Sequence, residues 1–321
     1  MKRNGPGKSY REGITLVQMI KMFPDNDAAL RWFEEARWGE SRIPDCCPSC
    51  GSSDKISVVP SGKPLAYWCG HCRSAFSVKT GTVMHRSKIS YQNWAIAIFL
   101  WTVSLKGVSS MQLYRHLGIT QKSAHFMAHR LREAWTEDTE ADREGPVEVD
   151  ETHIGGLVKN MSNQKRKEHR GRGTAGKTVV IGVKDRDSGN IRAEVIPSTS
   201  KEDLQGFIAD NVAPGATVYT DEHASYKDRP YYDHEYVTHS AKQFVDGMAH
   251  TNGMESFWAL LKRGYHGTFH KMSEKHLHRY INEFATRQNL REEDTLEIMK
   301  KTVGMMVGKR LTYNQMTYGK D

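Results

Sequence analysis

Carboxylates supply the first chemical signal in the sequence. An apolar run that begins at Val218 closes on Asp221, a pattern typical of a buried strand that presents an acid at its carboxyl end. After a further 33 residues comes Glu255, in a segment whose helical spacing places Asn252, Glu255 and Lys262 on or near one face. Two carboxylates brought together in this way could hold a divalent metal ion. Acids are also common at strand ends and on helices, so this stretch alone leaves an ordinary structural role open.

A third acid comes from the segment PVEVDETHIGG, which alternates like a strand and carries Asp150. Asp150, Asp221 and Glu255 in an open cluster could hold two hard cations about 3.5–4 Å apart. One cation would activate the attacking oxygen of a phosphodiester reaction, and the other would stabilise the leaving oxygen. Oxygen ligands without a His or Cys set favour magnesium or manganese over zinc. Lys262, two helical turns after Glu255, could contact a phosphate.

The elements that must position these acids are predicted within residues 145–290. The segments KTVVIGVKD and NIRAEVIP indicate a hairpin about residues 187–189, SKEDLQGFIADNV indicates a helix with Ser200 as its N-cap, and EYVTHS indicates a fifth strand. The resulting order is three strands, a helix, a strand, a short helical piece, a strand and a helix. This order is typical of a ribonuclease H-like α/β domain, a mixed sheet flanked by helices in which the first and fourth strands are neighbours. Asp150 and Asp221 would then lie side by side.

Cysteines mark a second candidate metal site. The pairs Cys47-x2-Cys50 and Cys69-x2-Cys72 are separated by 18 residues, the spacing expected of two knuckles that grip one tetrahedral zinc ion. All five cysteines lie between residues 46 and 72, which indicates one local site in a reducing compartment and not a disulfide framework.

Short strands are predicted around residues 56–59 and 65–68, so the cysteine segment is interpreted as a zinc ribbon. In so small a unit, metal binding would supply folding free energy on the order of 10 kcal/mol. Cys46 is expected to be a bystander, although a slipped spacing could let it replace Cys47. A redox role for the two CxxC pairs is the alternative interpretation.

Helical patterns lie on both sides of the cysteine segment. Two short amphipathic helices are predicted between residues 15 and 37, broken at Phe23-Pro24, with Asp25 or Asp27 as the N-cap of the second. After the cysteines, Ser90 is predicted to cap a buried helix.

A helix-turn-helix is predicted next, with Gly118 at the end of its first helix and Thr120 as the N-cap of its second. The second helix is predicted to bury four residues and to expose five polar ones as a candidate DNA-recognition surface. The four are Ala124, Met127, Ala128 and Leu131, and the five are Gln121, Lys122, His125, His129 and Arg132.

Charge favours an anionic partner. The chain carries 46 Lys and Arg against 38 Asp and Glu, a net charge of +8. Residues 157–177 hold seven Lys or Arg and one acid, which is most of that excess. We expect this basic insert to be structureless without DNA and to contact the DNA backbone. Its candidate contacts are Lys165, Arg166, Lys167, Arg170 and Arg172.

Five segments are expected along the chain. They are an N-terminal helical segment (1–40), a zinc ribbon (41–88), a helix-turn-helix region (89–140), a ribonuclease H-like catalytic domain (145–290) with its basic insert (157–177), and a helical C-terminal tail (291–321). The N-terminus lacks the apolar core of a signal peptide, and no run of about 18 apolar residues predicts a membrane span. A cytoplasmic protein is therefore expected.

Taken together, these pieces resemble a known group of proteins. FPDNDAALRWFEEARWG before CPSC, YWCGHCRSAFSVKTGTVMHRSKISYQNW, VEVDETHIGG, VYTDEHASY and HTNGMESFWALLKRGYHG are similar to segments of bacterial insertion-sequence transposases. Those proteins join an N-terminal zinc ribbon and helix-turn-helix to a DDE catalytic domain. The resemblance covers nearly the whole chain, and the combination is more specific than any one piece.

The resemblance implies an enzyme that binds double-stranded DNA, cleaves it at element ends and transfers the strand to target DNA with magnesium on a ribonuclease H-like fold. It places two catalytic acids at Asp150 and Asp221, whereas the third position of that group is written as either Asn or Glu. Both Asn252 and Glu255 fit, and Glu255 is favoured because a carboxylate neutralises metal charge better than an amide does. Joining two element ends calls for at least a dimer in the DNA complex. The resemblance also implies a protein associated with the bacterial nucleoid.

Other classes remain open at this point. The chain could be a non-catalytic DNA-binding regulator built on the ribbon and helices, or a structure-specific nuclease that shares the fold and its metals. The sequence does not identify the terminal repeat, the target preference, the replicative or cut-and-paste route, or the oligomeric state without DNA.

Overall fold

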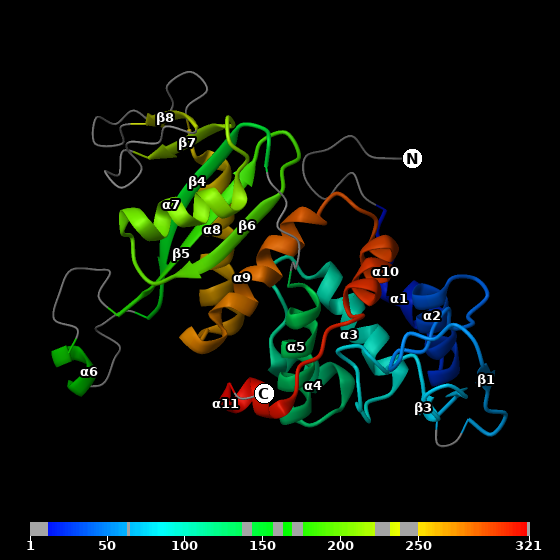
Figure 1. Ribbon diagram of the computed structural model, residues 1–321. Coiled ribbons are helices and arrows are strands. Elements are labelled where there is room, and N and C mark those ends of the chain that lie inside the picture. The colour runs from blue at the N-terminus through cyan, green and yellow to red at the C-terminus, as the bar shows by residue number, and fades with distance from the viewer. Residues whose placement is uncertain are drawn as a thin grey trace. The chain divides into compact units, whose positions relative to one another are not determined.

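The computed structural model describes residues 12–62, 65–136, 143–156, 163–168, 176–221, 232–237 and 250–319. The chain forms two compact units. The first consists of Met1–Trp135 together with Leu290–Asp321, and the second is Thr136–Asn289 (Figure 1). In the described part of the chain, no helix is both long and apolar enough to span a membrane.

The first unit begins with two helices, α1 (Leu16–Met22) and α2 (Asn26–Trp38). They are separated at Phe23-Pro24, as predicted, because proline has no N–H to continue a helix. Of the two expected N-caps, Asp25 is the one used: its carboxylate accepts a hydrogen bond from the Ala28 backbone N–H at 2.8 Å.

A small antiparallel sheet follows, formed by β1 (Ile56–Val58), β2 (Tyr67–Cys69) and β3 (Ser74–Phe76) in that order. The third strand was not predicted from the sequence. Tyr67 stacks on Phe76 with ring centroids 5.5 Å apart and meets Trp38 of α2 edge-on at 5.2 Å. This sheet is therefore packed against α2 and does not stand alone.

Three helices come next, α3 (Tyr91–Val103), α4 (Ser110–Leu117) and α5 (Gln121–Ala134), and local signals define their ends. The side chains of Ser90, Ser109 and Thr120 accept the capping N–H bonds of α3, α4 and α5. Gly118 ends α4 in the left-handed conformation, at a φ of 62°. The capping positions predicted at Ser90, Gly118 and Thr120 are confirmed here.

The exposed face predicted for α5 is wrong at two positions. His129 and Arg132 are only 1% and 2% exposed, whereas Gln121 and Lys122 are exposed and His125 is partly buried. The Arg132 guanidinium lies 5.2 Å from the centroid of the buried Trp101 ring on α3. Packing against α3 therefore buries a side chain that was expected to be exposed to solvent. The four positions predicted to be buried, Ala124, Met127, Ala128 and Leu131, are buried.

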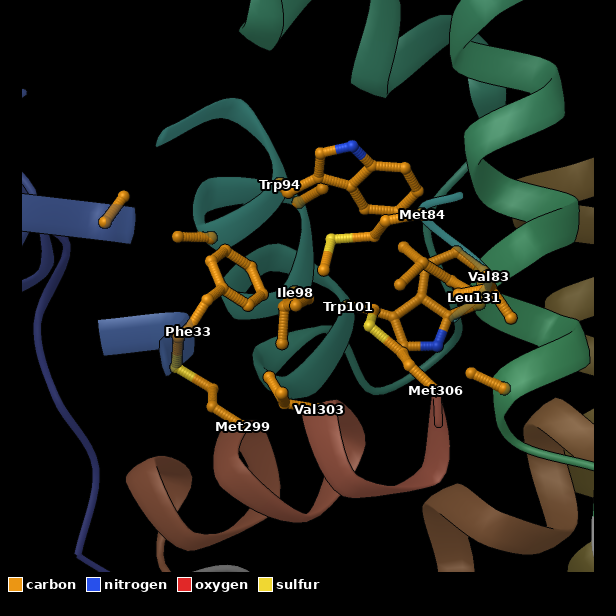
Figure 2. Close-up of a cluster of buried hydrophobic side chains, with 14 of the residues drawn as sticks. Phe33, Val83, Met84, Trp94, Ile98, Trp101, Leu131, Met299, Val303 and Met306 are labelled. Carbon is orange, nitrogen blue, oxygen red and sulfur yellow. The ribbon is translucent and has the colours of Figure 1, made fainter. Parts of the chain in front are cut away.

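The C-terminal segment expected as a helical tail forms α10 (Thr295–Met305) and α11 (Tyr313–Tyr318), and it belongs to the first unit. Figure 2 shows Met299, Val303 and Met306 in one cluster with side chains from α2 and α3. The Trp135 indole N–H donates to the Thr302 hydroxyl at 3.0 Å. Residues some 170 positions apart therefore share one core.

The second unit contains a five-stranded mixed sheet. Its strands are β4 (Val147–Ile154), β5 (Thr178–Asp185), β6 (Ile191–Ile196), β7 (Thr217–Asp221) and β8 (Asp233–Val237), and their spatial order is β6-β5-β4-β7-β8. The pairs β4–β5 and β5–β6 are antiparallel, whereas β4–β7 and β7–β8 are parallel. The predicted hairpin, and the predicted adjacency of the first and fourth strands, are confirmed.

Helices cover both faces of this sheet (Figure 1). On one face α7 (Lys201–Asn211), capped by Ser200 as predicted, packs its apolar residues against alternate residues of β4 and β5. On the other face lie α8 (Asn252–Gly264), its π-helical continuation η5 (Tyr265–Phe269) and α9 (Glu274–Asn289). A Cβ atom at Gly182 of β5 would collide with Met254 and lie 2.9 Å from Trp258, so glycine lets α8 sit close to the sheet.

The basic insert is not structureless throughout. Its residues Asn163–Glu168 form a short helix, α6, on which Arg166 and Lys167 are exposed. Lys165 lies on the same helix, whereas Arg170 and Arg172 fall outside the described residues. A run of six residues without glycine or proline, within an otherwise glycine-rich insert, accounts for a helix at this point.

Candidate active site and cysteine centre

Strand register brings Asp150 and Asp221 together. In the parallel pair β4–β7, Val147 faces Val218 and Glu148 faces Tyr219. Two residues further along each strand, Asp150 and Asp221 occupy equivalent positions. Because side chains alternate along a strand, both acids lie on the face that α8 covers.

The Asp150 carboxyl is short of positive partners. Burial raises its pKa to about 7, and the negative charges of Glu151 and Asp221 add to the effect. Hydrogen bonds oppose this shift, and the strongest side-chain one comes from the Trp258 indole N–H, which donates to Asp150 Oδ2 at 3.0 Å. Two oxygen-donor acids that repel each other in this way suit a hard divalent cation, so the residues present fit magnesium or manganese.

A buried acid that the sequence did not single out anchors the start of α8. Glu148 is 2% exposed, and its Oε2 accepts the backbone N–H groups of Gly253 at 2.7 Å and Met254 at 3.1 Å. Its Oε1 lies 3.0 Å from Nε of Arg186 and 3.3 Å from Nδ1 of His250. A carboxylate at a helix N-terminus satisfies free N–H groups and complements the helix dipole.

Arg186, which pairs with Glu148, also contacts β7: its guanidinium lies 3.9 Å from the centroid of the Tyr219 ring. The only signal of Glu148 in the sequence is its place two residues before Asp150, on the same face of a strand. Its partners come from the turn after β5, from the segment before α8 and from α8 itself, which sequence spacing does not connect.

The remaining predicted site residues, Asn252, Glu255 and Lys262, are all exposed on α8. At about 100° per residue, Glu255 lies about 60° around the helix from Trp258, whereas Asn252 lies about 120° away. Glu255 is thus nearer to the stripe that faces Asp150. Among the described residues, however, Asp150, Asp221 and Glu255 do not form a group with clustered ligand atoms.

Basic residues flank the far end of β4. Burial lowers the pKa of His153, and the positive charges of Lys177 and Lys262 lower it further. A Cβ atom at Gly155 would lie 3.1 Å from Lys177, so Gly155, just before the basic insert, lies next to its last residue. Three to four residues of strand separate this end from Asp150, a span of about 13 Å.

Four cysteines of the first unit form the one group of metal-ligand side chains found in the described part of the chain. The ligand atoms of Cys47, Cys50, Cys69 and Cys72 all lie within 4.8 Å of one another. Sγ of Cys47 is 3.7 Å from Sγ of Cys72, and Sγ of Cys50 is 3.8 Å from Sγ of Cys69. Tetrahedral zinc with Zn–S bonds near 2.3 Å requires S···S separations of about 3.8 Å. The four thiols therefore fit a zinc ion.

These thiols are free, and their separations are much longer than a disulfide bond of about 2.05 Å. Although burial favours the neutral thiol, hydrogen bonds from the backbone N–H groups of Ser49 and Cys50 help to lower the pKa of Cys47 to about 7. Cys46 is exposed and outside the group, so the slipped spacing that would have used it is not adopted.

Comparisons with known proteins identify a family for the second unit. Residues 143–289, which contain the sheet and α8 and α9, match the family model of the ISXO2-like transposase domain. The chain is 25% identical over 291 residues to an uncharacterized protein in transposable element ISH50 of Halobacterium salinarum, covering 88% of this chain and 97% of that protein. It is 30% identical over 112 residues to an uncharacterized transposase-like protein of Haemophilus influenzae, covering 34% of this chain and 89% of that protein.

Proposed function

Because the chain belongs to the insertion-sequence transposases that carry an ISXO2-like domain, we propose that it is a DDE-type enzyme that cleaves DNA at element ends and transfers the cut strand. Membership of a transposase family implies DNA binding. The observation that carries the proposal is the register of β4 and β7, which sets Asp150 and Asp221 at equivalent positions on one face.

In this proposal Asp150 and Asp221 would hold magnesium or manganese, and Glu255 would complete the set from α8. The bound metal would activate the attacking oxygen and stabilise the leaving oxygen of the phosphodiester. Trp258 holds the Asp150 carboxylate in a fixed orientation through its indole N–H. Lys262 and Lys177, both close enough to act on His153, would attract the negatively charged DNA backbone at the far end of β4.

The fold-level part of the proposal is a ribonuclease H-like catalytic domain. The observed strand order, with the first and fourth strands adjacent, supports it. The helices α4 and α5, joined at Gly118, would act as a helix-turn-helix that presents Gln121 and Lys122 to DNA. The cysteine group would hold zinc in a ribbon, and the exposed cations of α6 would contact the DNA backbone.

The test is cleavage and joining of DNA that carries the ends of the element, with and without added magnesium. Asp221→Asn should abolish both reactions while leaving DNA binding intact. Asp210→Asn, a change of the same kind at an exposed position of α7, is the matched control and should behave as the unaltered protein does.

Two results would redirect the proposal. Tight, sequence-specific binding without cleavage by the well-folded, unaltered protein would indicate a DNA-binding regulator. Cleavage that requires a branched junction, and not a defined terminal sequence, would indicate a structure-specific nuclease.

A further inference from the structure

The first unit contains a cavity of about 560 Å³ that none of the predicted site residues lines. Its walls come from four parts of the chain. Asp45 and Ser49 border it from the cysteine loop, Arg37 from α2, His85 from the turn before α3, and Lys309 and Arg310 from the segment after α10. The volume is within the range of about 300–1,000 Å³ typical of ligand pockets.

This cavity is strongly basic. Arg37, Lys309 and Arg310 line it against the single acid Asp45, and the imidazole of His85 lies on the same wall. Burial lowers the pKa of His85, and the positive charges of Arg310, Arg86 and Arg130 lower it further. Burial and Arg310 likewise lower the pKa of Arg130 to about 10.

Asp45 is the single acid on the pocket wall, so the positive charge there is only partly neutralised. Among the ion pairs that join described residues, none includes Arg86, Arg130 or Arg310. Like charges held close together cost free energy unless an anion neutralises them. An anionic ligand would supply that neutralisation.

Hydrogen bonds hold the cavity walls in place. Arg37 Nη1 donates to the carbonyl oxygens of Val78 at 2.6 Å and Thr80 at 2.8 Å. The Gly308 N–H donates to the Gly81 carbonyl oxygen at 2.9 Å, which joins the C-terminal segment to the turn before α3. The Arg37 side chain, and the backbone that leads into Lys309 and Arg310, are thus held in place before a ligand arrives, which lowers the conformational entropy cost of binding.

We propose that this basic pocket binds a backbone phosphate of duplex DNA. The inference rests on the proposed function, because a transposase must hold DNA, and it adds a contact outside α5 and the basic insert. The pocket borders the cysteine loop, so the phosphate would tie the ribbon and the C-terminal segment to the same duplex. Arg310 is exposed at the rim and within reach of a polyanion, whereas Arg37 and His85 are partly buried. The exposed Val307 side chain offers an apolar surface for the adjoining sugar.

The experiment is binding of the full-length protein to a fluorescently labelled duplex, without added magnesium, between about 50 and 200 mM salt. Arg310→Ala should weaken binding about tenfold at low salt and reduce the slope of log K against log salt concentration by about 1. The loss should be the same for element ends and unrelated sequences, because a phosphate contact carries no sequence information. Arg310→Lys keeps the charge and should retain the slope.

Arg31→Ala is the matched control, because Arg31 is an exposed arginine of α2 that does not line the pocket. It removes the same net charge and should change neither affinity nor slope. Equal effects of Arg31→Ala and Arg310→Ala would overturn the inference, since they would reflect overall charge alone. It would also be overturned if free ATP bound in an Arg310-dependent manner while duplex affinity did not depend on Arg310.

These outcomes are separable from those that test cleavage. If duplex affinity depends on Arg310 but the protein never cleaves DNA, the phosphate contact is supported and the catalytic proposal is refuted. Unchanged duplex affinity in Arg310→Ala, together with cleavage that Asp221→Asn abolishes, would do the reverse.

Discussion

The hydrogen bond from Trp258 to Asp150 allows a test at the scale of one atom pair. Trp258→Phe keeps an aromatic ring against Gly182 but removes the N–H that donates to Oδ2. Partners that orient a metal ligand typically contribute about 10- to 100-fold to metal affinity or activity. We expect the magnesium concentration needed for half-maximal cleavage to rise by about that factor, measured by magnesium titration. An unchanged magnesium requirement in a folded variant would show that Trp258 only fills space.

Glu148 is the second single residue with a clear expectation. Glu148→Ala would leave the Arg186 guanidinium and two N–H groups of α8 without their acceptor in a buried site. Removing one partner of a buried ion pair costs about 3–5 kcal/mol, so urea unfolding of the second unit should shift to much lower concentration. Glu202→Gln, on the exposed side of α7, is the control and should change stability by less than about 0.5 kcal/mol.

The residues of the candidate active site differ in how well the sequence predicts them. Asp150 and Asp221 could be predicted because each ends or interrupts an apolar strand pattern, and strand order then makes them neighbours. The role of Glu148 could not be predicted, since its partners converge only in the folded unit. The place of Glu255 relative to the two aspartates stays a prediction.

At the scale of elements, α5 has some features that depend on nearby residues and others that depend on tertiary packing. Its capping residue, Thr120, was predictable because the cap depends on residues within one turn. The burial of His129 and Arg132 was not, because it depends on how α3 packs against α5. Helical periodicity identifies an apolar face but does not say how much of the polar face a neighbouring helix will cover.

Arg132 and Lys122 should therefore respond differently to the same substitution. Arg132→Ala removes a buried guanidinium from the Trp101 ring, a desolvated contact worth about 2 kcal/mol, and should lower the thermal stability of the first unit. Lys122→Ala, at an exposed position, should change stability by less than about 0.5 kcal/mol. Thermal unfolding monitored by circular dichroism checks both. Equal losses of thermal stability in the two variants would mean that the contact of Arg132 with Trp101 does not stabilise the first unit.

At the scale of the whole molecule, chain continuity is a poor guide to the first unit. Its core combines α2 and α3 with α10, which follows only after the entire second unit (Figure 2). The apolar spacing of residues 295–305 predicts a helix but does not identify its packing partner. The basic pocket forms because residues 307–310 pack next to the cysteine loop of the first unit. The sequence did not predict this pocket.

Zinc removal tests how the ribbon is held within this unit. Its three strands have three residues each, too few to form a stable sheet by themselves, so four metal–sulfur bonds should supply folding free energy on the order of 10 kcal/mol. A zinc chelator, or Cys69→Ser, should therefore abolish one bound zinc per chain and unfold the ribbon, measured by metal analysis and by proteolysis of residues 41–88.

Cys46→Ser is the matched control for that prediction, because Cys46 is exposed and lies outside the ligand group. It should retain zinc and resist proteolysis. The contacts of Tyr67 with Trp38 and Phe76 are the competing source of stability for the ribbon. If this aromatic packing alone held the ribbon folded, it would stay resistant to proteolysis after zinc is removed. We expect those contacts to survive only when zinc fixes Cys69, two residues from Tyr67 on the same strand and on the same face.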